Sequence, residues 1–284
     1  MKRKGLRRNV TREIARLDPV RDHQRIVYLT SAFDLPWDSQ RALERALLRT
    51  FGVPHSSKLM VATGEFVHRT QKRYDDTVIL VSTIGLCGYD SPPGRAAIRR
   101  MNQIHRRYKI PNDEFLYVLS TFVLEPLRWN ARFGVRPLSD NERAAIFLFW
   151  REVGRRMAIR GIPDTIAELE RFSLAYEREH FAYSPDNQLL AEVTRDLFLS
   201  WVLPRPLRRF GKPVVHALFD ARMRLAFGFA LPPWWVRVGV VAALKLRARV
   251  ARLLPPRRRP YTLPPTRTYP RGYRLEEIGP AHVP

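Results

Sequence analysis

The chain has 284 residues, enough for one large domain or two small ones, and its hydrophobic content of 45% is too high for a disordered protein. The single cysteine, Cys87, excludes an internal disulfide and any multi-cysteine zinc or iron–sulfur site within one chain. Lysine and arginine number 50 against 27 acidic residues, and the resulting net charge of +23 favours an anionic partner such as a membrane surface or a nucleic acid.

The positive charge lies mainly at the two ends of the sequence. Residues 1–25 hold nine basic and three acidic residues, and residues 237–274 hold eleven basic residues and no acidic one. The 211 residues between 26 and 236 carry a net charge of only +8. Contact with an anionic surface is therefore expected at the ends of the chain rather than on its body.

Helical periodicity dominates the sequence and predicts an all-α fold, a single large helical bundle. A basic N-terminal arm (1–21) precedes the helical domain (22–233), and a basic amphipathic helix (234–253) leads into a tail (254–284) that its prolines and arginines keep extended. The predicted helices are Asp22–Phe33, Pro36–Phe51, Lys58–Phe66, Thr70–Ile84, Gly94–Tyr108, Asp113–Phe133, Asp140–Ile159, Thr165–Phe181, Asn187–Val202, Val214–Phe229 and Trp234–Leu253.

Start and stop signals support several of these helices. Ser139 and Glu142 have the spacing of a capping box, and Asn112 and Asp164 are candidate N-caps. Gly134 and Gly161 are expected to end helices. The β-branched run Val78–Ser82 has no partner strand of similar pattern, so we assign it to a helix.

No segment has the roughly 20 apolar residues that a membrane-spanning helix needs, and no apolar stretch follows the basic start as in a signal peptide. We therefore expect a cytoplasmic protein, associated with a membrane at most peripherally. The segment Trp234–Leu254 has tryptophans at one end and interleaves valines and leucines with arginines. Such a helix suits the plane of an anionic bilayer, or else packs its apolar side on the body; the two alternatives do not exclude each other.

Most common catalytic motifs are absent. The seven histidines include no pair spaced to bind zinc from one helical face, and the sequence has no phosphate-binding loop, dinucleotide fingerprint or nucleophile elbow. Cys87 has no histidine nearby in sequence and is expected to be a buried small hydrophobic residue.

Two groups of residues could carry chemistry. Arg73, Asp76 and Thr77 share one face of a helix, either as a ligand site or, as the pattern alone favours, with Arg73 and Asp76 in a simple ion pair. His105 lies on the apolar stripe of its helix. It is either a hydrogen-bonded core residue or the single imidazole that holds iron in a haem protein.

Longer stretches of sequence around these groups resemble the MpaB-type oxygenases, which are related to the haem-dependent rubber oxygenases (latex-clearing proteins). The resemblance starts near residue 22. It is carried by the segments Arg73–Thr77, Asp90–His105, Asn112–Trp129, Phe149–Gly154 and Ile162–Pro163, and by shorter ones at Tyr269–Tyr273 and Gly279–Pro280.

The resemblance implies a globin-like helical core with b-type haem, in which His105 is the metal ligand. It further implies a haem-dependent oxygenase that uses dioxygen to cleave a C=C bond, or carry out a related oxidation, in an apolar, isoprenoid or lipid-like substrate. Arg73 would hold a haem propionate or polarise dioxygen, while Asp76 and Thr77 would order water or deliver protons. Asp76 departs from the lysine of the rubber-cleaving branch.

Further expectations concern the surroundings of His105 and the substrate. The second ring nitrogen of His105 should bond to a backbone carbonyl one turn back. Phe115, Leu119, Phe122 and Phe149 should line a pocket for a hydrocarbon chain. Binding to an anionic membrane would use residues 1–25 and 234–274.

Two non-enzymatic alternatives remain open at this stage. One is a basic helical protein that binds anionic lipid or nucleic acid, although no helix-turn-helix, RRM or zinc-finger pattern supports the nucleic-acid version. The other is a lipid-binding module that keeps the oxygenase fold without haem.

Overall fold

Helices make up nearly all of the regular structure, as the sequence predicts. The computed structural model describes residues 5–255, 257–263 and 265–280, and within these ranges the protein is all-α and contains no β-strand. The parts of the predicted arm and tail at residues 1–4 and 281–284 lie outside the described residues.

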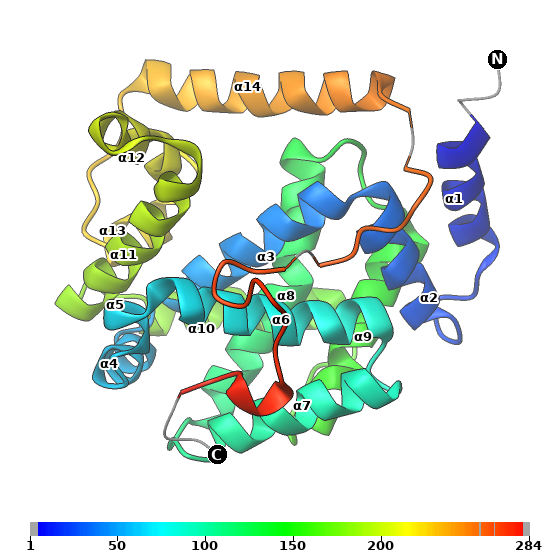
Figure 1. Cartoon of the computed structure of the whole chain (residues 1–284), viewed down its shortest axis with the longest axis horizontal. Helices are drawn as coiled ribbons and strands as arrows, with labels where there is room; N and C mark the ends of the chain where they lie inside the picture. Colours follow the sequence, from blue (N-terminus) through cyan, green and yellow to red (C-terminus); the bar gives the residue numbers. More distant parts are fainter. Residues whose placement is uncertain (1–4, 256, 264, 281–284) are drawn as a thin grey trace.

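The helices follow one another with short connections (Figure 1). Their bounds are α1 Gly5–Arg16, α2 His23–Tyr28, α3 Pro36–Thr50, α4 Pro54–Ala62, α5 Glu65–His68, α6 Thr70–Cys87, α7 Pro92–His105, α8 Asn112–Phe133, α9 Asp140–Arg156, α10 Ile166–His180, α11 Pro185–Val202, α12 Arg208–His216, α13 Ala221–Ala226 and α14 Trp234–Leu253. A π-helical turn, Leu29–Asp34, continues α2, and 3₁₀ turns lie at Arg205–Leu207 and Leu275–Glu277.

The core forms where three helix pairs meet. α3 packs against α8, α6 against α7 and α2 against α9, and these contacts bury a continuous apolar cluster that includes Ile79, Leu119 and Phe149. α1 also belongs to this body, since Ile14 is buried in the same cluster. Figure 1 shows the chain after α14 returning across the front of α6 to reach α7.

Several predicted boundaries are corrected by the structure. The predicted helix Val214–Phe229 is two helices, because Asp220 is extended and its side chain accepts a hydrogen bond from the Met223 amide as the N-cap of α13. The predicted helix Lys58–Phe66 is divided into α4 and α5 at Gly64, which has a φ of +69°.

The cap predictions are partly confirmed. Ser139 and Glu142 form the predicted capping box at the start of α9, and Gly134 ends α8. The N-cap of α10 is Thr165 rather than Asp164. Asn112 is not an N-cap but the first residue of α8, where its side chain pairs with the backbone of Arg160.

Gly161 lies in a loop after the end of α9, so it does not terminate that helix directly. Cys87 is exposed at the end of α6 rather than buried.

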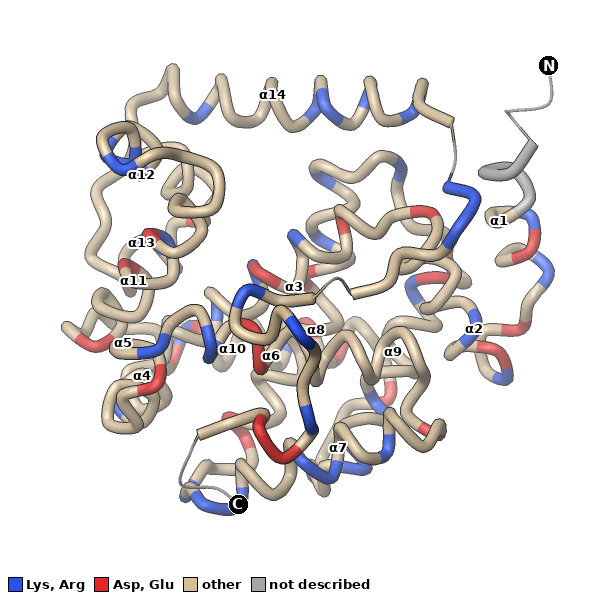
Figure 2. Tube along the Cα trace, in the orientation of Figure 1, with Lys and Arg blue, Asp and Glu red and all other residues tan. Residues whose placement is uncertain are grey.

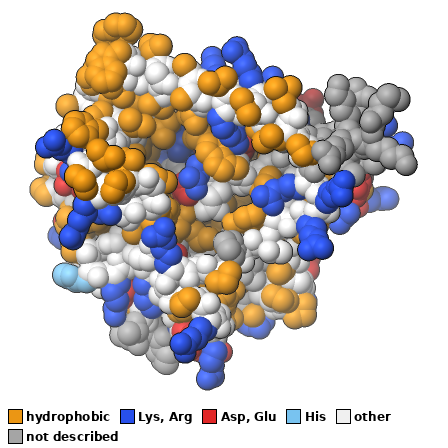
Figure 3. All heavy atoms as spheres, turned by 45° about the horizontal axis from the view of Figure 1, so that its top comes forward, with side chains coloured by type: hydrophobic (Ala, Val, Ile, Leu, Met, Phe, Trp, Pro, Cys, Tyr) orange, Lys and Arg blue, Asp and Glu red, His pale blue; other side chains and the backbone are white. Residues whose placement is uncertain are grey.

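The basic helix α14 lies along one side of the molecule and is held there by its inner face. Val241 and Leu244 pack on a small cluster around Trp129, and Arg247 pairs with the buried Asp38 at 2.8 Å. Its outer face exposes large apolar side chains: Trp234, Trp235, Val238, Leu246, Val250 and Leu253. Figure 2 shows basic positions along α14 and no acidic one, and Figure 3 shows hydrophobic side chains gathered on this side of the molecule with lysine and arginine between them.

None of the helices in the described ranges is both long enough and apolar enough to cross a membrane.

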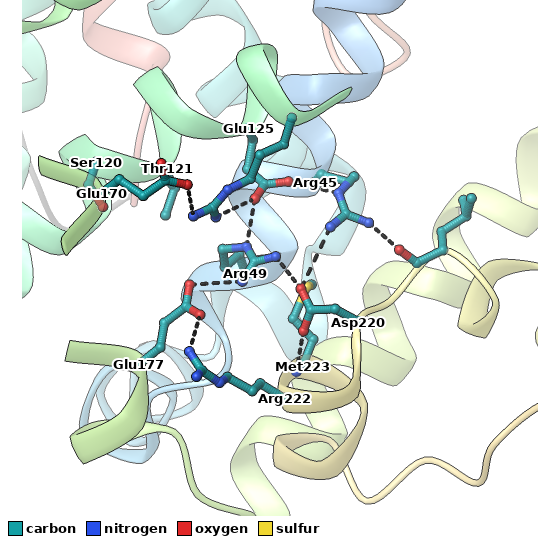
Figure 4. Close-up of polar contacts among 12 residues, drawn as sticks. Arg45, Arg49, Ser120, Thr121, Glu125, Glu170, Glu177, Asp220, Arg222 and Met223 are labelled. Atoms are coloured by element: carbon teal, nitrogen blue, oxygen red, sulfur yellow. Dashed lines mark hydrogen bonds and ion pairs between the residues drawn. The ribbon is translucent and has the colours of Figure 1, made fainter. Parts of the chain in front are cut away.

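A buried ion network ties α3 to three other parts of the chain (Figure 4). The guanidinium of Arg49 pairs with Glu125 of α8, Glu177 of α10 and Asp220 at the start of α13. Glu125 is fully buried and is also paired with Arg45 at 2.7 Å. The network fixes the helices that border one side of the cavity described next.

Candidate functional site

A cavity of about 260 Å³ opens between α3, α4, α6, α7, α8 and α9. Its volume is slightly below the roughly 300–1,000 Å³ of typical ligand pockets. Most of its lining is apolar, and Phe115, Leu119 and Phe122 contribute to it as predicted. Phe149 does not; it is buried in the core and borders a smaller cavity of about 80 Å³ on the other side of Trp150.

The turn between α6 and α7 sets the position of the next residues. α7 starts at Pro92 after its N-cap Ser91, whose hydroxyl accepts a hydrogen bond from the Gly94 amide at 3.0 Å. Gly94 is required there, because a Cβ would lie 1.9 Å from the carbonyl oxygen of Gly88. This close approach brings the far end of α7 beside the first half of α6, where both predicted groups of residues lie.

His105, the last residue of α7, lines the cavity and stacks edge-to-face on Phe115 with ring centroids 5.3 Å apart. Its Nδ1 is buried and has no hydrogen-bond partner among the described residues. The predicted bond to a backbone carbonyl one turn back is therefore absent. Burial, assisted by the nearby charge of Arg73, lowers the pKa of His105 to about 4, so the imidazole is neutral near pH 7.

Arg73 and Thr77 line the same cavity from α6. The Arg73 guanidinium donates to the Thr77 hydroxyl and lies 4.8 Å from the ring centre of Phe66. It forms no ion pair within the described part of the chain, and burial lowers its pKa. The simple Arg73–Asp76 ion pair is therefore not formed, since Asp76 pairs with Lys72 instead.

Asp76 is bound by three donors. Its Oδ2 accepts from Lys72 Nζ at 2.7 Å and from the Gly279 amide at 3.0 Å, and its Oδ1 accepts from the Tyr269 hydroxyl at 2.7 Å. The three predicted residues thus share one face of α6 and line one cavity, but the carboxylate of Asp76 is hydrogen-bonded to residues of the tail.

The other carboxylates of the lining are also partnered. Glu44 pairs with Arg41 and accepts a hydrogen bond from the Tyr74 hydroxyl. Glu65 pairs with Arg69. Glu114 accepts a hydrogen bond from the Ser56 hydroxyl and contacts the His55 ring. Within the described lining, Arg73 is the single basic side chain. The cavity thus offers an anion one guanidinium that pairs with no carboxylate of the described residues.

These features fit a haem site better than a multi-ligand metal site. The described residues contain no group of three or more His, Cys, Asp or Glu side chains that could hold a metal ion. A porphyrin supplies four of its metal's ligands itself, so one neutral imidazole in an apolar cavity is enough to hold it. His105 can provide this imidazole. Its Nδ1 has no hydrogen-bond partner among the described residues, so no such bond at Nδ1 has to be broken.

Comparison with known proteins identifies the family of the chain. Residues 46–253 match the family described as "ER-bound oxygenase mpaB/B'/Rubber oxygenase, catalytic domain". The chain belongs to this oxygenase family.

Among its relatives is the ER-bound oxygenase mpaB of Penicillium roqueforti (strain FM164), 31% identical over 218 residues, which are 69% of this chain and 72% of that protein. The ER-bound oxygenase mpaB' of Penicillium brevicompactum is 32% identical over 235 residues, covering 75% of this chain and 54% of that protein. The mpaB protein of the same fungus is 31% identical over 211 residues, 66% of this chain and 52% of that protein. The chain thus spans about half the length of the two Penicillium brevicompactum relatives.

Sequence reasoning missed the contribution of the tail. Gly279 and Pro280 line the cavity, although they lie far along the chain and beyond the family match. Lys72 was also missed as the partner of Asp76. Lys72 lies four residues before Asp76 and Arg73 lies three before it, and both spacings allow an ion pair on a helix. This spacing was the signal in the sequence that could have identified Lys72.

Proposed function

We propose that the protein is a haem b-dependent oxygenase that oxidises an apolar, isoprenoid or lipid-like substrate with dioxygen, by C=C cleavage or a related reaction. The family is that of oxygenases, and the observation that supports the haem assignment is the neutral imidazole of His105 in an apolar cavity, whose buried Nδ1 has no hydrogen-bond partner among the described residues. Bound haem would supply the dioxygen chemistry, and the chain supplies placement and exclusion of water.

The proposed roles follow from the contacts of each side chain. His105 would hold the iron through a ring nitrogen, and its low pKa leaves one of its two ring nitrogens without a proton near pH 7. Arg73 offers its unpaired guanidinium to a carboxylate of the cofactor, with Thr77 fixing its orientation. Phe115, Leu119 and Phe122 present a surface without hydrogen-bonding groups to an apolar substrate.

Haem titration tests this assignment. We expect haemin added to the purified protein to give a saturable Soret band with a ligand-field spectrum typical of histidine coordination. His105→Ala should lose that spectrum, while His68→Ala, which changes an exposed histidine at the end of α5, should keep it. Absence of a saturable Soret shift in wild type would overturn the haem proposal and favour the lipid-binding alternative. An identical spectrum for His105→Ala would remove His105 as the ligand.

We also propose that an anionic membrane surface is a partner, and that α14 lies in its interface. The supporting observation is the orientation of the helix: Val241, Leu244 and Arg247 face the body, while both tryptophans and several large aliphatic residues face outward. Neighbouring α12 and the 3₁₀ turn before it add exposed Phe210 and Leu207. Aromatic and aliphatic side chains flanked by cations are the composition of helices that lie in a bilayer interface. The basic N-terminal segment 1–25 would add a second cationic contact.

Flotation with vesicles tests the membrane proposal. Full-length protein should float with phosphatidylcholine vesicles that contain phosphatidylserine and much less with phosphatidylcholine alone. The triple variant Trp235→Ser, Leu246→Ser, Leu253→Ser should bind at least about tenfold more weakly, because it removes three outward apolar side chains. Tyr183→Ser, an exposed ring in the loop before α11, is the matched control. Equal flotation of the triple variant and wild type would refute the role of α14.

A further inference from the structure

The tail after α14 is bound to α6 and α7 by many specific contacts. Thr268 donates to Oδ2 of Asp75 through its amide at 2.9 Å and through its hydroxyl at 2.6 Å. Farther along, Arg100 of α7 donates to the carbonyl oxygens of Ile278 and Glu276, both at 2.8 Å. The side chain of Ile278 is fully buried in the main apolar core. The tail is therefore packed against the body through specific side-chain contacts.

Lys72 and Asp76 together bind both backbone polar groups of one residue in the tail, Gly279. Lys72 Nζ donates to the Gly279 carbonyl at 2.8 Å and to the Glu277 carbonyl at 3.1 Å, while Asp76 accepts from the Gly279 amide. Each of the two side chains also neutralises the other at 2.7 Å. Because Asp76 is almost fully buried, these partners take the place of the water that its carboxylate oxygens would otherwise bind.

The segment held in this way forms part of the cavity. Gly279 and Pro280 belong to its lining, and Gly279 lies so close to α7 that a Cβ would be 2.7 Å from Cδ1 of Ile104. Its φ of +109° is also one that other residues rarely adopt. Both conditions require glycine at the point where the tail meets the cavity.

We propose that residues 265–280 are a fixed wall of the ligand cavity, and that Asp75 and Asp76 are positioning residues that hold this wall. In this assignment the carboxylate of Asp76 does not handle protons for the reaction, because Lys72, Tyr269 and Gly279 already occupy its oxygens. The proposal rests on the cavity of the proposed function, but it does not depend on haem.

Thiol labelling measures the wall directly. In a Cys87→Ser background, which removes the sole natural thiol, Val78→Cys places a thiol of similar size in the cavity lining. We expect slow reaction with a maleimide in the intact protein. Asp76→Asn and Asp75→Asn should each raise the rate at least tenfold, and Asp90→Asn, which changes an exposed aspartate paired with Arg156, should not.

A second variant separates positioning from chemistry. Arg100 holds the same segment but does not line the cavity, so Arg100→Gln leaves every side chain of the lining unchanged. It should raise the labelling rate as Asp76→Asn does, and hydrogen exchange of the Gly279 amide should accelerate in both. This variant also covers the case in which Asp76→Asn fails to fold.

The outcomes are distinct. Unchanged labelling and unchanged exchange in both Asp76→Asn and Arg100→Gln would overturn the wall. Faster labelling in a protein that binds no haem would support the wall and reject only the cofactor. If Asp76→Asn lost oxidation of a substrate while labelling and exchange matched wild type, Asp76 would be a catalytic group and the positioning role would be wrong.

Discussion

Single buried charges decide much of this fold, and Arg49 is the clearest case. It is almost fully buried, and its guanidinium pairs with three carboxylates from three different elements (Figure 4). Burial alone would raise the pKa of Glu125, but the attraction of Arg45 and Arg49 outweighs it and leaves that pKa below its usual value. The carboxylate is therefore ionised and depends on these arginines.

Removal of the Arg49 charge should be costly. We expect Arg49→Met to lower the free energy of unfolding by about 3–5 kcal/mol, since it leaves buried carboxylates without a main partner. Urea titration followed by circular dichroism measures the change. Arg25→Met breaks an exposed pair with Glu13 and should cost at most about 1 kcal/mol. Equal costs for the two variants would show that the buried network contributes nothing special.

A second residue-level prediction concerns acid stability. His216 stacks on Phe229, and its Nε2 accepts a hydrogen bond from the Arg195 guanidinium at 3.1 Å. Lys212 adds positive charge nearby, and Asp196 adds a smaller negative influence. Burial first, and then these cations, lower its pKa to about 4 in the folded state. The unfolded chain, with a histidine pKa of about 6.5, therefore binds more protons than the folded one between these values. This contribution to stability is complete above about pH 6.5 and is lost as the pH falls toward 4.

Unfolding free energies measured from pH 7 to pH 4 test this. His216→Gln should reduce the slope over that range by up to about 1.4 kcal/mol per pH unit, the limit for one proton. The exposed His68→Gln is measured beside it as the control for removal of a histidine side chain. A slope unaffected by His216→Gln would contradict the assignment.

At this scale the sequence predicted which residues share a site, but not their partners. The helical spacing correctly placed Arg73, Asp76 and Thr77 on one face. The predicted Arg73–Asp76 pair is not formed because Asp76 pairs with Lys72, one helical turn away, and it is also bound by the Gly279 amide, which lies 203 residues away in sequence. Helical spacing is compatible with the Lys72 pair, but the contact with Gly279 is of another kind. Local periodicity carries no information about such a contact.

Helices and their junctions were predicted with similar limits. Apolar periodicity placed α3, α6, α8 and α14 nearly where they lie, because long amphipathic segments carry strong signals. Breaks between short helices were missed where a side chain interrupts the helix because it binds a residue elsewhere in the fold. Asp220 is the example: it caps α13 and binds Arg49, and both tasks interrupt a segment that looks continuously helical.

Two glycines inside helices allow a matched prediction. A Cβ at Gly85 of α6 would meet no atom within 4 Å, whereas at Gly154 of α9 it would lie 2.5 Å from Leu119. We expect Gly85→Ala to raise the unfolding free energy by about 0.5–1 kcal/mol through its helix propensity. Gly154→Ala should lower it by about 1–3 kcal/mol through overpacking. Thermal unfolding of both variants measures this, and the same sign for the two would contradict the packing around α9.

On the scale of the whole molecule, α14 is attached to the body through few contacts. Arg247 lies 3.7 Å from the ring centre of Trp37 and pairs with Asp38, which Trp129 also binds. We expect Arg247→Met to accelerate hydrogen exchange along α14 about tenfold, or about 1.4 kcal/mol, while α6 and α8 keep their protection. The outward Arg249→Met should leave exchange unchanged. Equal exchange in the two variants would mean that Arg247 does not hold the helix on the body.

The large-scale arrangement of the tail was the least predictable feature. Its prolines indicated an extended chain, which the structure confirms for much of its described part, but nothing in its composition indicated that it completes the cavity. That role depends on the distance between α6 and α7 and on a single glycine that fits between them.

The order of synthesis gives this wall a biological consequence. A ribosome makes every helix around the cavity before it reaches Gly279, so these helices can pack before the last part of the lining is in place. A ligand present during that interval would meet a cavity without the proposed wall, whereas a ligand added to the finished protein would have to enter past it. We therefore expect a ligand supplied during translation to be bound faster than the same ligand added to the finished protein, which also binds it.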